Sequence, residues 1–230
     1  MSRVRVVVIG AGAFGGWSAL ELVRRGAQVT LVDAWGPGHA RSSSGGETRV
    51  IRATYGSHVV YTRMAARALR LWREHERRSG VRLLYQTGAL WIFADDTAFR
   101  AGSAAALRSE GLPCEQLSTA EAGRRYPQVR FDDVQAVMVE PEAGYLLARQ
   151  ACEHVAASVA LEGGELLQGT APAPLLPGNP LRRLELLDGR VLEADAFVFA
   201  CGPWLPAIFP DVIGQRISIT RQEVYYFGTP

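Results

Sequence analysis

Three glycines near the N-terminus of this chain, Gly10, Gly12 and Gly15, have the spacing of a turn that holds a phosphate. Gly10 allows a tight turn after a strand, Gly12 lets a pyrophosphate approach the backbone, and Gly15 lets a helix pack closely. Asp33 ends the next apolar run, where a carboxylate can accept hydrogen bonds from ribose hydroxyls and disfavours the 2′-phosphate of NADP. The spacing predicts a dinucleotide site; the alternative is an ordinary strand–helix–strand unit with a tight turn.

A second candidate group is a pair of arginines, Arg49 and Arg52, which follow a serine-glycine loop at residues 42–46. A planar guanidinium can hold a carboxylate through two charge-assisted hydrogen bonds. The spacing of three predicts that both arginines share one face of a helical turn or lie close together at its start. The alternative is that they only pair with Glu47 or other surface acids, because arginine supplies all 25 basic residues and lysine is absent.

Composition excludes several classes of function. The 230 residues are 48% hydrophobic and 21% charged, as in a globular protein, and the net charge of +2 is too small to indicate nucleic-acid or membrane-surface binding. Without lysine there is no P-loop or Schiff-base lysine in this chain. The cysteines (Cys114, Cys152 and Cys201) and the four histidines are scattered, which predicts no metal site and suits the cytoplasm. No apolar run reaches the roughly 20 residues of a membrane span.

The loop after Asp33 separates two kinds of nucleotide domain. A nicotinamide-type fold would continue into a second crossover helix, whereas residues 36–46 are rich in proline, glycine and serine. The long loop favours a flavin-type domain. Apolar periodicity predicts strands at 6–9, 29–32, 88–93, 135–139, 165–168, 196–200 and 217–227, a hairpin at 184–193 with a two-residue turn, and helices at 16–25, 58–79, 97–110, 145–161 and from 118.

Four motifs together resemble one family. They are the glycine fingerprint, the serine-glycine loop followed by Thr48-Arg49-x-x-Arg52, the stretch from Glu140-Pro141 to Gly144, and an apolar strand ending in Ala200-x-Gly202-x-Trp204. Through them the chain resembles the D-amino-acid oxidase-like FAD-dependent oxidoreductases, in particular the monomeric sarcosine oxidase and N-methyltryptophan oxidase branch, over essentially its whole length. The resemblance implies an α/β fold: a Rossmann-type FAD-binding domain (1–80 and 145–210) with an inserted, incomplete antiparallel-sheet substrate domain (81–144 and 211–230).

The resemblance also implies roles for particular residues. Arg49 is expected beside the flavin, where a positive charge stabilises the reduced anion, and Arg52 is expected to hold the carboxylate of an amino-acid or amine substrate. The expected reaction is hydride transfer from an amino acid or N-methyl amino acid to the flavin, with peroxide formed on reoxidation by oxygen. The residues expected to bind FAD are Gly10, Gly12, Ala13, Phe14, Gly15, Asp33, Ala34, Ser43, Ser44, Thr48, Arg49, Pro172, Ala200, Gly202 and Trp204.

The chain departs from the family pattern in two ways. Gly45 stands where the family usually has a histidine, which argues against sarcosine itself as the substrate. Family members also continue well beyond this point, with a lysine and, in this branch, a covalent cysteine that none of the three cysteines matches. The expectation is therefore an N-terminal part that needs a complementing C-terminal half or self-associates, with little activity alone. The alternatives are a truncated, non-catalytic nucleotide-binding module or, less favoured, an NAD-dependent dehydrogenase.

Overall fold

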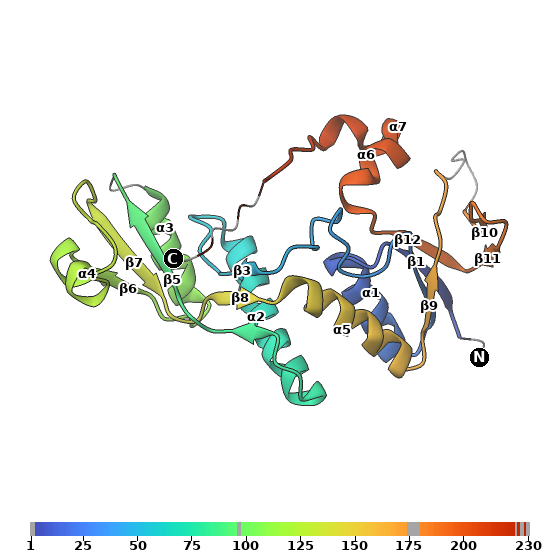
Figure 1. The fold of residues 1–230 in the computed structure, drawn as a ribbon, viewed down its shortest axis with the longest axis horizontal. Helices are drawn as coiled ribbons and strands as arrows, with labels where there is room; N and C mark the ends of the chain where they lie inside the picture. The colour runs from blue at the N-terminus through green and yellow to red at the C-terminus, as the bar shows by residue number, and fades with distance from the viewer. Residues whose placement is uncertain (1–2, 96–97, 174–179, 224, 226–227, 229–230) are drawn as a thin grey trace. The chain divides into compact units, whose positions relative to one another are not determined.

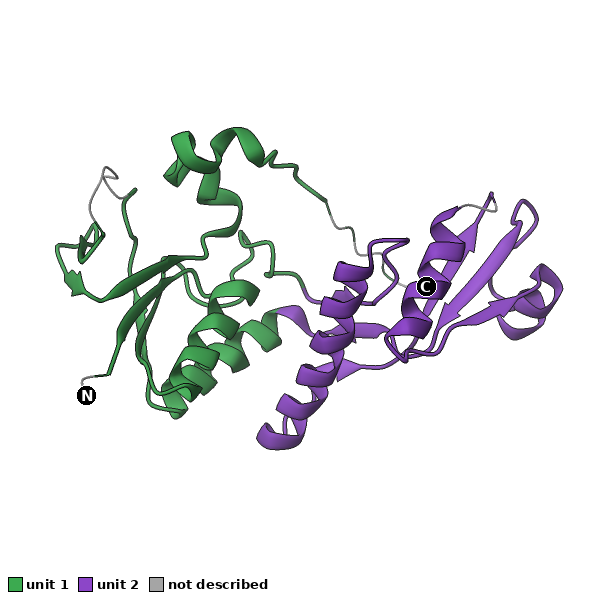
Figure 2. Cartoon of the chain, turned by 180° about the vertical axis from the view of Figure 1, so that it is seen from behind, with its two compact units in different colours: residues 1–46, 149–230 green, residues 47–148 purple. Residues whose placement is uncertain are grey.

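The computed structural model describes residues 3–95, 98–173, 180–223, 225 and 228. The chain divides into two compact units, coloured separately in Figure 2. Unit 1 comprises Met1–Gly46 and Arg149–Pro230, and unit 2 comprises Glu47–Ala148. Among the described residues, no helix is long and apolar enough to cross a bilayer.

Unit 1 is built on a parallel sheet in the order β12-β1-β2-β9, which Figure 1 shows together with the helices α1 and α5. The run of β-branched residues in β1 pairs on both sides, so Val8 faces Val198 of β12 and Leu31 of β2. All residues from Val6 to Ile9 are buried, so both faces of the strand are covered, which is why its sequence is continuously apolar rather than alternating. The bounds are β1 Arg5–Ile9, α1 Ala13–Arg24, β2 Gln28–Asp33, α5 Ala148–Leu161, β9 Glu165–Gln168 and β12 Ala196–Phe199.

A hairpin covers part of this sheet. Strands β10 (Arg183–Glu185) and β11 (Val191–Glu193) pair in antiparallel register, and Leu184 and Leu186 pack with Val7, Ile9 and Val32 of the sheet. The predicted hairpin therefore forms. Its loop is longer than the two residues expected, because the Leu186 N–H still donates to the Arg190 carbonyl and the left-handed Gly189 (φ +85°) closes the turn.

Unit 2 contains two antiparallel sheets of three strands each. One has the order β3-β8-β4 and the other β5-β7-β6. The helix α4 begins as expected with a capping box, in which Ser118 and Glu121 bond to each other's backbone N–H. The bounds are β3 Arg49–Ile51, α2 Val59–Ser79, β4 Leu84–Tyr85, β5 Ala89–Phe93, α3 Ala98–Ser109, β6 Glu115–Leu117, α4 Thr119–Arg125, β7 Ala136–Glu140 and β8 Gly144–Leu146.

The boundaries of the two compact units differ from those of the expected domains. Residues 47–80 belong to unit 2, because β3 pairs with β8 and α2 packs against β4 and α3. Residues 211–230 group with unit 1 instead of with 81–144. The assignment of one unit to the cofactor and the other to the substrate stays a prediction.

Two predicted elements are wrong. Residues 145–161 do not form one helix, because Gly144–Leu146 is the strand β8, paired with both β3 and β4, and α5 begins at Ala148. Residues 217–223 of the predicted strand 217–227 are not a strand, and residues 224, 226 and 227 lie outside the described residues. Alternating β-formers make a strand only when a neighbouring strand supplies a hydrogen-bonded ladder, and none of the described strands pairs with this segment. The chain after β12 forms short helical turns, η1 Gly202–Trp204, α6 Leu205–Ile208, α7 Pro210–Ile213 and η2 Gly214–Arg216.

Candidate functional site

The glycine turn brings three parts of unit 1 together at the carboxyl end of the sheet. Gly10 has a left-handed φ of +105°, and its N–H donates to the Val32 carbonyl at 2.7 Å. A Cβ on Gly10 would lie 2.4 Å from the Ala200 carbonyl oxygen, and a Cβ on Gly15 would lie 1.7 Å from the Gly10 carbonyl oxygen. The strand end, the helix start and the end of β12 are therefore too close for any side chain at these positions.

The serine-glycine loop is attached to the N-terminus of α1. The Ser44 Oγ accepts a hydrogen bond from the Ala13 N–H at 3.0 Å, and a Cβ on Gly12 would lie 3.3 Å from the same oxygen. The first turn of α1 contains no acidic side chain. The unsatisfied N–H groups and the partial positive charge of a helix start suit the phosphates of a dinucleotide.

Asp33 joins the glycine turn to the loop that follows β2. Its Oδ2 accepts the Ala11 N–H at 2.7 Å, and its Oδ1 accepts the N–H groups of Trp35 and Gly36, each at 2.9 Å. Both carboxylate oxygens thus organise backbone around the pocket. An ionised carboxylate has about four acceptor positions, so capacity for a ribose hydroxyl remains.

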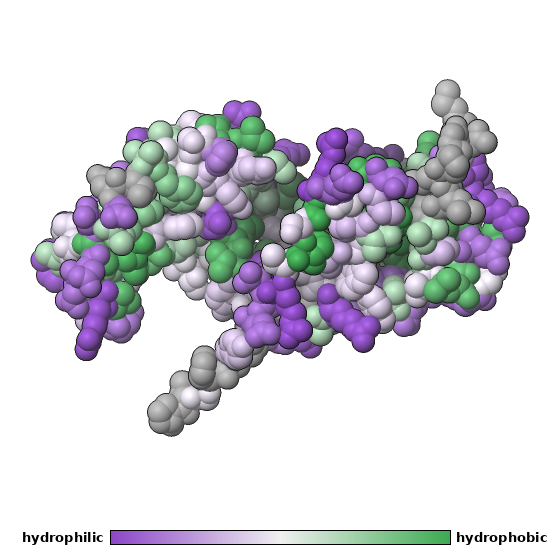
Figure 3. All heavy atoms as spheres, turned by 90° about the horizontal axis from the view of Figure 1, so that it is seen from above, coloured by the Kyte–Doolittle hydropathy of each residue, from purple (hydrophilic) through white to green (hydrophobic). Residues whose placement is uncertain are grey.

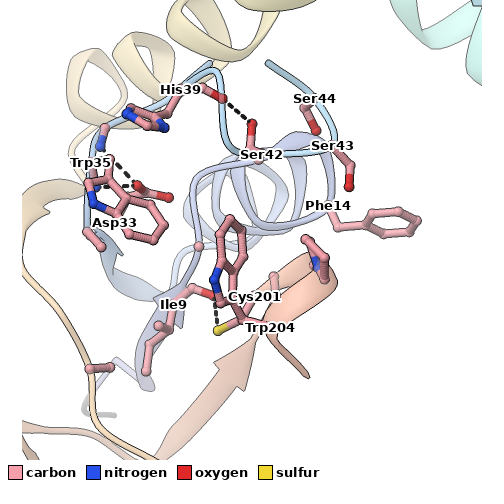
Figure 4. A pocket seen from close by; sticks show the side chains of 18 of the residues that line it. Ile9, Phe14, Asp33, Trp35, His39, Ser42, Ser43, Ser44, Cys201 and Trp204 are labelled. Carbon is pink, nitrogen blue, oxygen red and sulfur yellow. Dashed lines mark hydrogen bonds between the residues drawn. The ribbon is translucent and has the colours of Figure 1, made fainter. Parts of the chain in front are cut away.

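These parts surround a pocket of about 540 Å³ in unit 1, a volume in the range of small-molecule and cofactor sites. In Figure 4, Asp33, Trp35 and His39 lie at one end of the pocket, and Phe14 and Ser44 lie at the other. The rings of Trp35 and His39 stack with centroids 5.4 Å apart, and those of Trp35 and Trp204 lie 5.1 Å apart. The loops after β2 and after β12 therefore meet in an aromatic wall.

The pocket brings together most of the residues expected to bind the cofactor. Gly10, Gly12, Ala13, Phe14, Asp33, Ala34, Ser43, Ser44, Ala200, Gly202 and Trp204 line it. Gly15 lies beneath the turn, Pro172 follows the lining residue Ala171, and Thr48 and Arg49 belong to unit 2. The sequence analysis missed Trp35, His39 and Cys201. The position of Trp35 and His39 in the loop directly after Asp33 was the available signal.

Cys201 contributes a protonated thiol to the pocket wall. Its Sγ lies 3.5 Å from the Ile9 carbonyl oxygen, to which the S–H donates. Burial, together with the negative charge of Asp33, raises the pKa of the Cys201 thiol to about 11. All three cysteines of the chain are free. The Cys152 thiol in α5 lies 3.9 Å from the Ser44 carbonyl, and burial raises its pKa as well.

Arg52 is held in a second constellation, inside unit 2. Its guanidinium carbon lies 4.4 Å from the ring centroid of Tyr55 and 5.0 Å from that of Trp91, and its Nη1 donates to the Thr54 carbonyl. Among the described residues this is the one hydrogen bond of the Arg52 side chain. Two aromatic faces and a carbonyl therefore fix the plane of the guanidinium and leave other N–H donors for a ligand.

The expected geometry of the two arginines is wrong. Arg49 lies in β3 and is exposed, and Arg52 directly follows this strand, whereas the spacing predicted a helical turn. Side chains alternate along extended backbone, so residues three apart point to opposite faces. The backbone pairs with β8 here, which overrides the helical reading of the spacing.

The helical spacing of Tyr61 and Met64 within residues 58–79 predicts that both side chains pack in the core, and for the start of α2 this prediction is wrong. Tyr61 and Met64 are 55% and 61% exposed, and the buried face of the helix instead contains Thr62, Ala66, Leu69 and His75. The Tyr61 ring lies 5.7 Å from that of Tyr55. Tyr61 therefore belongs to the surroundings of Arg52. Its exposure marks it as a candidate site residue, and the periodicity of the sequence does not reveal that exposure.

A parallel-sheet nucleotide domain with a glycine turn, an acid at the end of β2 and an attached antiparallel unit defines a flavin-dependent class of protein. The chain matches the family of FAD dependent oxidoreductases over residues 5–230 and belongs to it. It is 29% identical to the monomeric sarcosine oxidase of Streptomyces avermitilis over 225 residues, which are 96% of this chain and 57% of that relative. It is 27% identical to the N-methyl-L-tryptophan oxidase of Citrobacter koseri over 212 residues, covering 92% of this chain and 57% of that relative.

Solved structures agree on the fold. The L-proline dehydrogenase from P. horikoshii superposes with a TM-score of 0.77 at 23% identity, covering 95% of this chain and 58% of that one. A glycine oxidase from Bacillus cereus superposes with a TM-score of 0.72 at 18% identity, covering 90% and 58%. The chain thus spans a little over half the length of the relatives it matches. Because the family depends on FAD, the NAD-dependent alternative is excluded.

Proposed function

We propose that this chain supplies the FAD site and the substrate-carboxylate site of an enzyme that oxidises an amino acid or an N-methyl amino acid. The observation that carries the proposal is the Arg52 guanidinium, fixed between Tyr55 and Trp91 with unused N–H donors. FAD, when bound, supplies the acceptor for the hydride and yields hydrogen peroxide on reoxidation by oxygen. The substrates named for the relatives support the amino-acid class, and Gly45 keeps sarcosine from being singled out.

The pocket of unit 1 fits this cofactor. The turn at Gly10 and Gly15 has no space for a Cβ, and the half-buried backbone at Gly12 stands at the start of α1, where a pyrophosphate is stabilised. Ser44 bonds Ala13 through its oxygen, so its own O–H is free to donate to a phosphate oxygen. Asp33 has the remaining acceptor capacity for the ribose.

The proposed task of Arg52 is to hold the substrate carboxylate so that one C–H bond is presented in a fixed direction. A guanidinium whose plane is already set loses little freedom when a carboxylate binds in bidentate fashion. Arg49, which is exposed in β3 and does not share a face with Arg52, keeps its separate proposed role as the cation beside the flavin. A non-catalytic nucleotide-binding module remains the second candidate, because the residues that line the pocket all belong to unit 1, whereas Arg52 belongs to unit 2.

The test is ligand binding by the FAD-loaded chain. FAD and NAD are titrated separately by calorimetry, and N-methyl-L-tryptophan, the substrate named for one relative, and its neutral amide are then titrated while the flavin absorbance is recorded. We expect FAD to bind more tightly than NAD, and the acid to perturb the flavin spectrum where the amide does not. Arg52→Ala should weaken binding of the acid by roughly 10- to 150-fold, the equivalent of about 1.5–3 kcal/mol for a hydrogen bond to a charged group.

Arg82 provides a matched control, because its guanidinium also lies 4.4 Å from the ring of a tyrosine three residues later, Tyr85. Arg82→Ala should leave binding of the acid unchanged. Equal affinity of the parent chain and Arg52→Ala for the acid would contradict the role of Arg52. FAD binding without any response to the acid would favour the non-catalytic module.

We further propose that the active form includes additional polypeptide, either a complementing chain or a second copy, and that the protein acts in the cytoplasm, where its free cysteines are stable. Apolar side chains reach the surface in several patches on the face drawn in Figure 3. In unit 2, Val50 of β3 and Val60 and Met64 of α2 are 64%, 65% and 61% exposed. Exposed apolar side chains of this kind are candidates for contact with another chain. Sedimentation velocity over a range of concentrations should detect self-association; a monomer at all concentrations would leave only the complementing chain.

A further inference from the structure

Glu140, at the end of β7, is a carboxylate that is completely buried in unit 2. Its Oε1 accepts the Ala53 N–H, and its Oε2 accepts the Thr54 hydroxyl at 2.5 Å. Ala53 and Thr54 are themselves fully buried. Burial of a carboxylate is unfavourable unless its oxygens are hydrogen-bonded, so this pair of contacts must be maintained for the segment to pack as it does.

The segment that Glu140 holds is the one that fixes Arg52. The strand β3 ends at Ile51, and residues 52–54 follow it outside the β3–β8 ladder. The Arg52 Nη1 donates to the carbonyl of Thr54, whose hydroxyl donates to Glu140. Two hydrogen bonds, one to the backbone and one from the side chain of Thr54, therefore connect the guanidinium to β7.

The other support of Arg52 depends on the same strand. Trp91 lies in β5, which pairs with β7 so that Trp91 is opposite Met138 and Ala89 is opposite Glu140. One aromatic wall of the guanidinium is thus placed by the β5–β7 ladder, and the carbonyl that it contacts is placed by the Glu140 carboxylate. β7 is the common base of both supports.

We propose that Glu140 is a positioning residue that holds the Arg52 guanidinium between Tyr55 and Trp91, ready for a substrate carboxylate. This inference rests on the proposed function of Arg52. Glu140 does not itself touch the substrate in this proposal; it acts through Ala53 and Thr54. Without its carboxylate, residues 52–54 lose their attachment to β7, and the arginine leaves the space between the two rings.

The test reads the arginine directly, by the side-chain Nε–Hε signals of the ¹⁵N-labelled chain. Ring currents of Tyr55 and Trp91 shift the Arg52 signal upfield, and Arg52→Lys, which removes it, assigns it. We expect Glu140→Ala to abolish this upfield shift. Glu140→Gln should retain it, because the amide oxygen can accept the Ala53 N–H and the amide nitrogen can donate to the Thr54 oxygen.

Three controls separate positioning from general loss of structure. The signal of Arg82, stacked on Tyr85, should keep its position in every variant. Glu142→Ala removes a nearby carboxylate that pairs with Arg73 and should not affect Arg52. Should Glu140→Ala fail to fold, Thr54→Val removes only the hydroxyl contact and should reduce the upfield shift of the Arg52 signal. Its control is Thr62→Val, at another fully buried threonine, which should leave that shift unchanged.

An unchanged Arg52 signal in folded Glu140→Ala or in Thr54→Val would overturn the proposal, as would a Gln variant that behaves like the Ala variant. Movement of the Arg82 signal together with that of Arg52 would also overturn it, since the effect would then be global. No substrate is used in this measurement. A failure here therefore contradicts the positioning role alone, whereas an Arg52→Ala variant with unchanged affinity for N-methyl-L-tryptophan contradicts the proposed function.

Discussion

The Ser44 hydroxyl oxygen lies 3.0 Å from the backbone nitrogen of Ala13 and accepts its hydrogen bond. This contact joins the serine-glycine loop to the first turn of α1, across 31 residues of sequence. It fixes a hydroxyl group at the place where a helix start attracts anions, and the hydroxyl keeps its own proton for donation. The loop and the helix therefore form one surface, which we propose binds the phosphates of FAD.

Ser44→Ala should weaken FAD binding by roughly tenfold or more, because a hydrogen bond to a charged phosphate contributes about 1.5–3 kcal/mol. The free energy of unfolding should change by no more than about 1.5 kcal/mol, the range of a neutral hydrogen bond. Calorimetric titration and urea denaturation measure the two effects. Ser109→Ala, which removes a hydroxyl bonded to the Ala106 carbonyl in α3, should change the free energy of unfolding by a similar amount and leave FAD binding unchanged.

Gly15→Ala should destabilise the protein by about 1–3 kcal/mol or more and should abolish FAD binding. Its Cβ would lie 1.7 Å from the Gly10 carbonyl oxygen, so the glycine turn or the helix must move. Gly123→Ala is the matched control, since a Cβ there meets no atom within 4 Å and the residue lies in the helix α4. That variant should be more stable by roughly 0.5–1 kcal/mol. Equal urea midpoints for both variants would contradict the close packing at Gly15.

Asp33→Asn should lower both FAD affinity and stability. The Asp33 carboxylate now accepts hydrogen bonds from three backbone N–H groups. In the variant the amide NH₂ would face at least one of these donors, and an unsatisfied donor costs about 1–3 kcal/mol. Asp195→Asn is the control. Asp195 accepts the Arg5 N–H at the amino ends of β12 and β1, whereas Asp33 lies at the carboxyl end of β2. It should reduce stability without a specific loss of FAD binding. If both variants bind FAD as the parent does, Asp33 does not organise the pocket.

Cys201 should resist alkylation at neutral pH. Its pKa is raised to about 11 from an ordinary value of 9.0, so the folded state holds the thiol proton more tightly than the unfolded chain does. The stabilising effect is complete below about pH 9 and is lost as the pH rises from there toward 11. Iodoacetamide labelling of the Cys201 peptide, followed by mass spectrometry, should give a rate that keeps increasing to about pH 11. A rate that levels off near pH 9, as it should in the urea-unfolded chain, would contradict the raised pKa.

The local parts of the nucleotide unit could be predicted from the sequence. The strand at 6–9, the strand at 29–32 and the acid at Asp33 agree with β1 and β2, and the helix differs chiefly in its start, at Ala13 rather than residue 16. These features follow from β-branched runs, glycine and amphipathic spacing, which act within a few residues of each other. The family motifs likewise indicated FAD before any fold was known.

Long-range pairing decided the rest. Arg52 meets Trp91 only because β5 pairs with β7 in a particular register, and Asp33 meets Ala11 only because β1 and β2 are neighbours. Pairing with β3 and β4 turned residues 144–146 into a strand, and residues 217–223, which no described strand pairs with, do not form one. Periodicity reports which side of its own element a residue occupies, but a site forms between elements. The sequence by itself therefore determined the glycine turn and the class of cofactor, whereas only the tertiary structure decided which groups contact Ser44, Asp33 and Arg52.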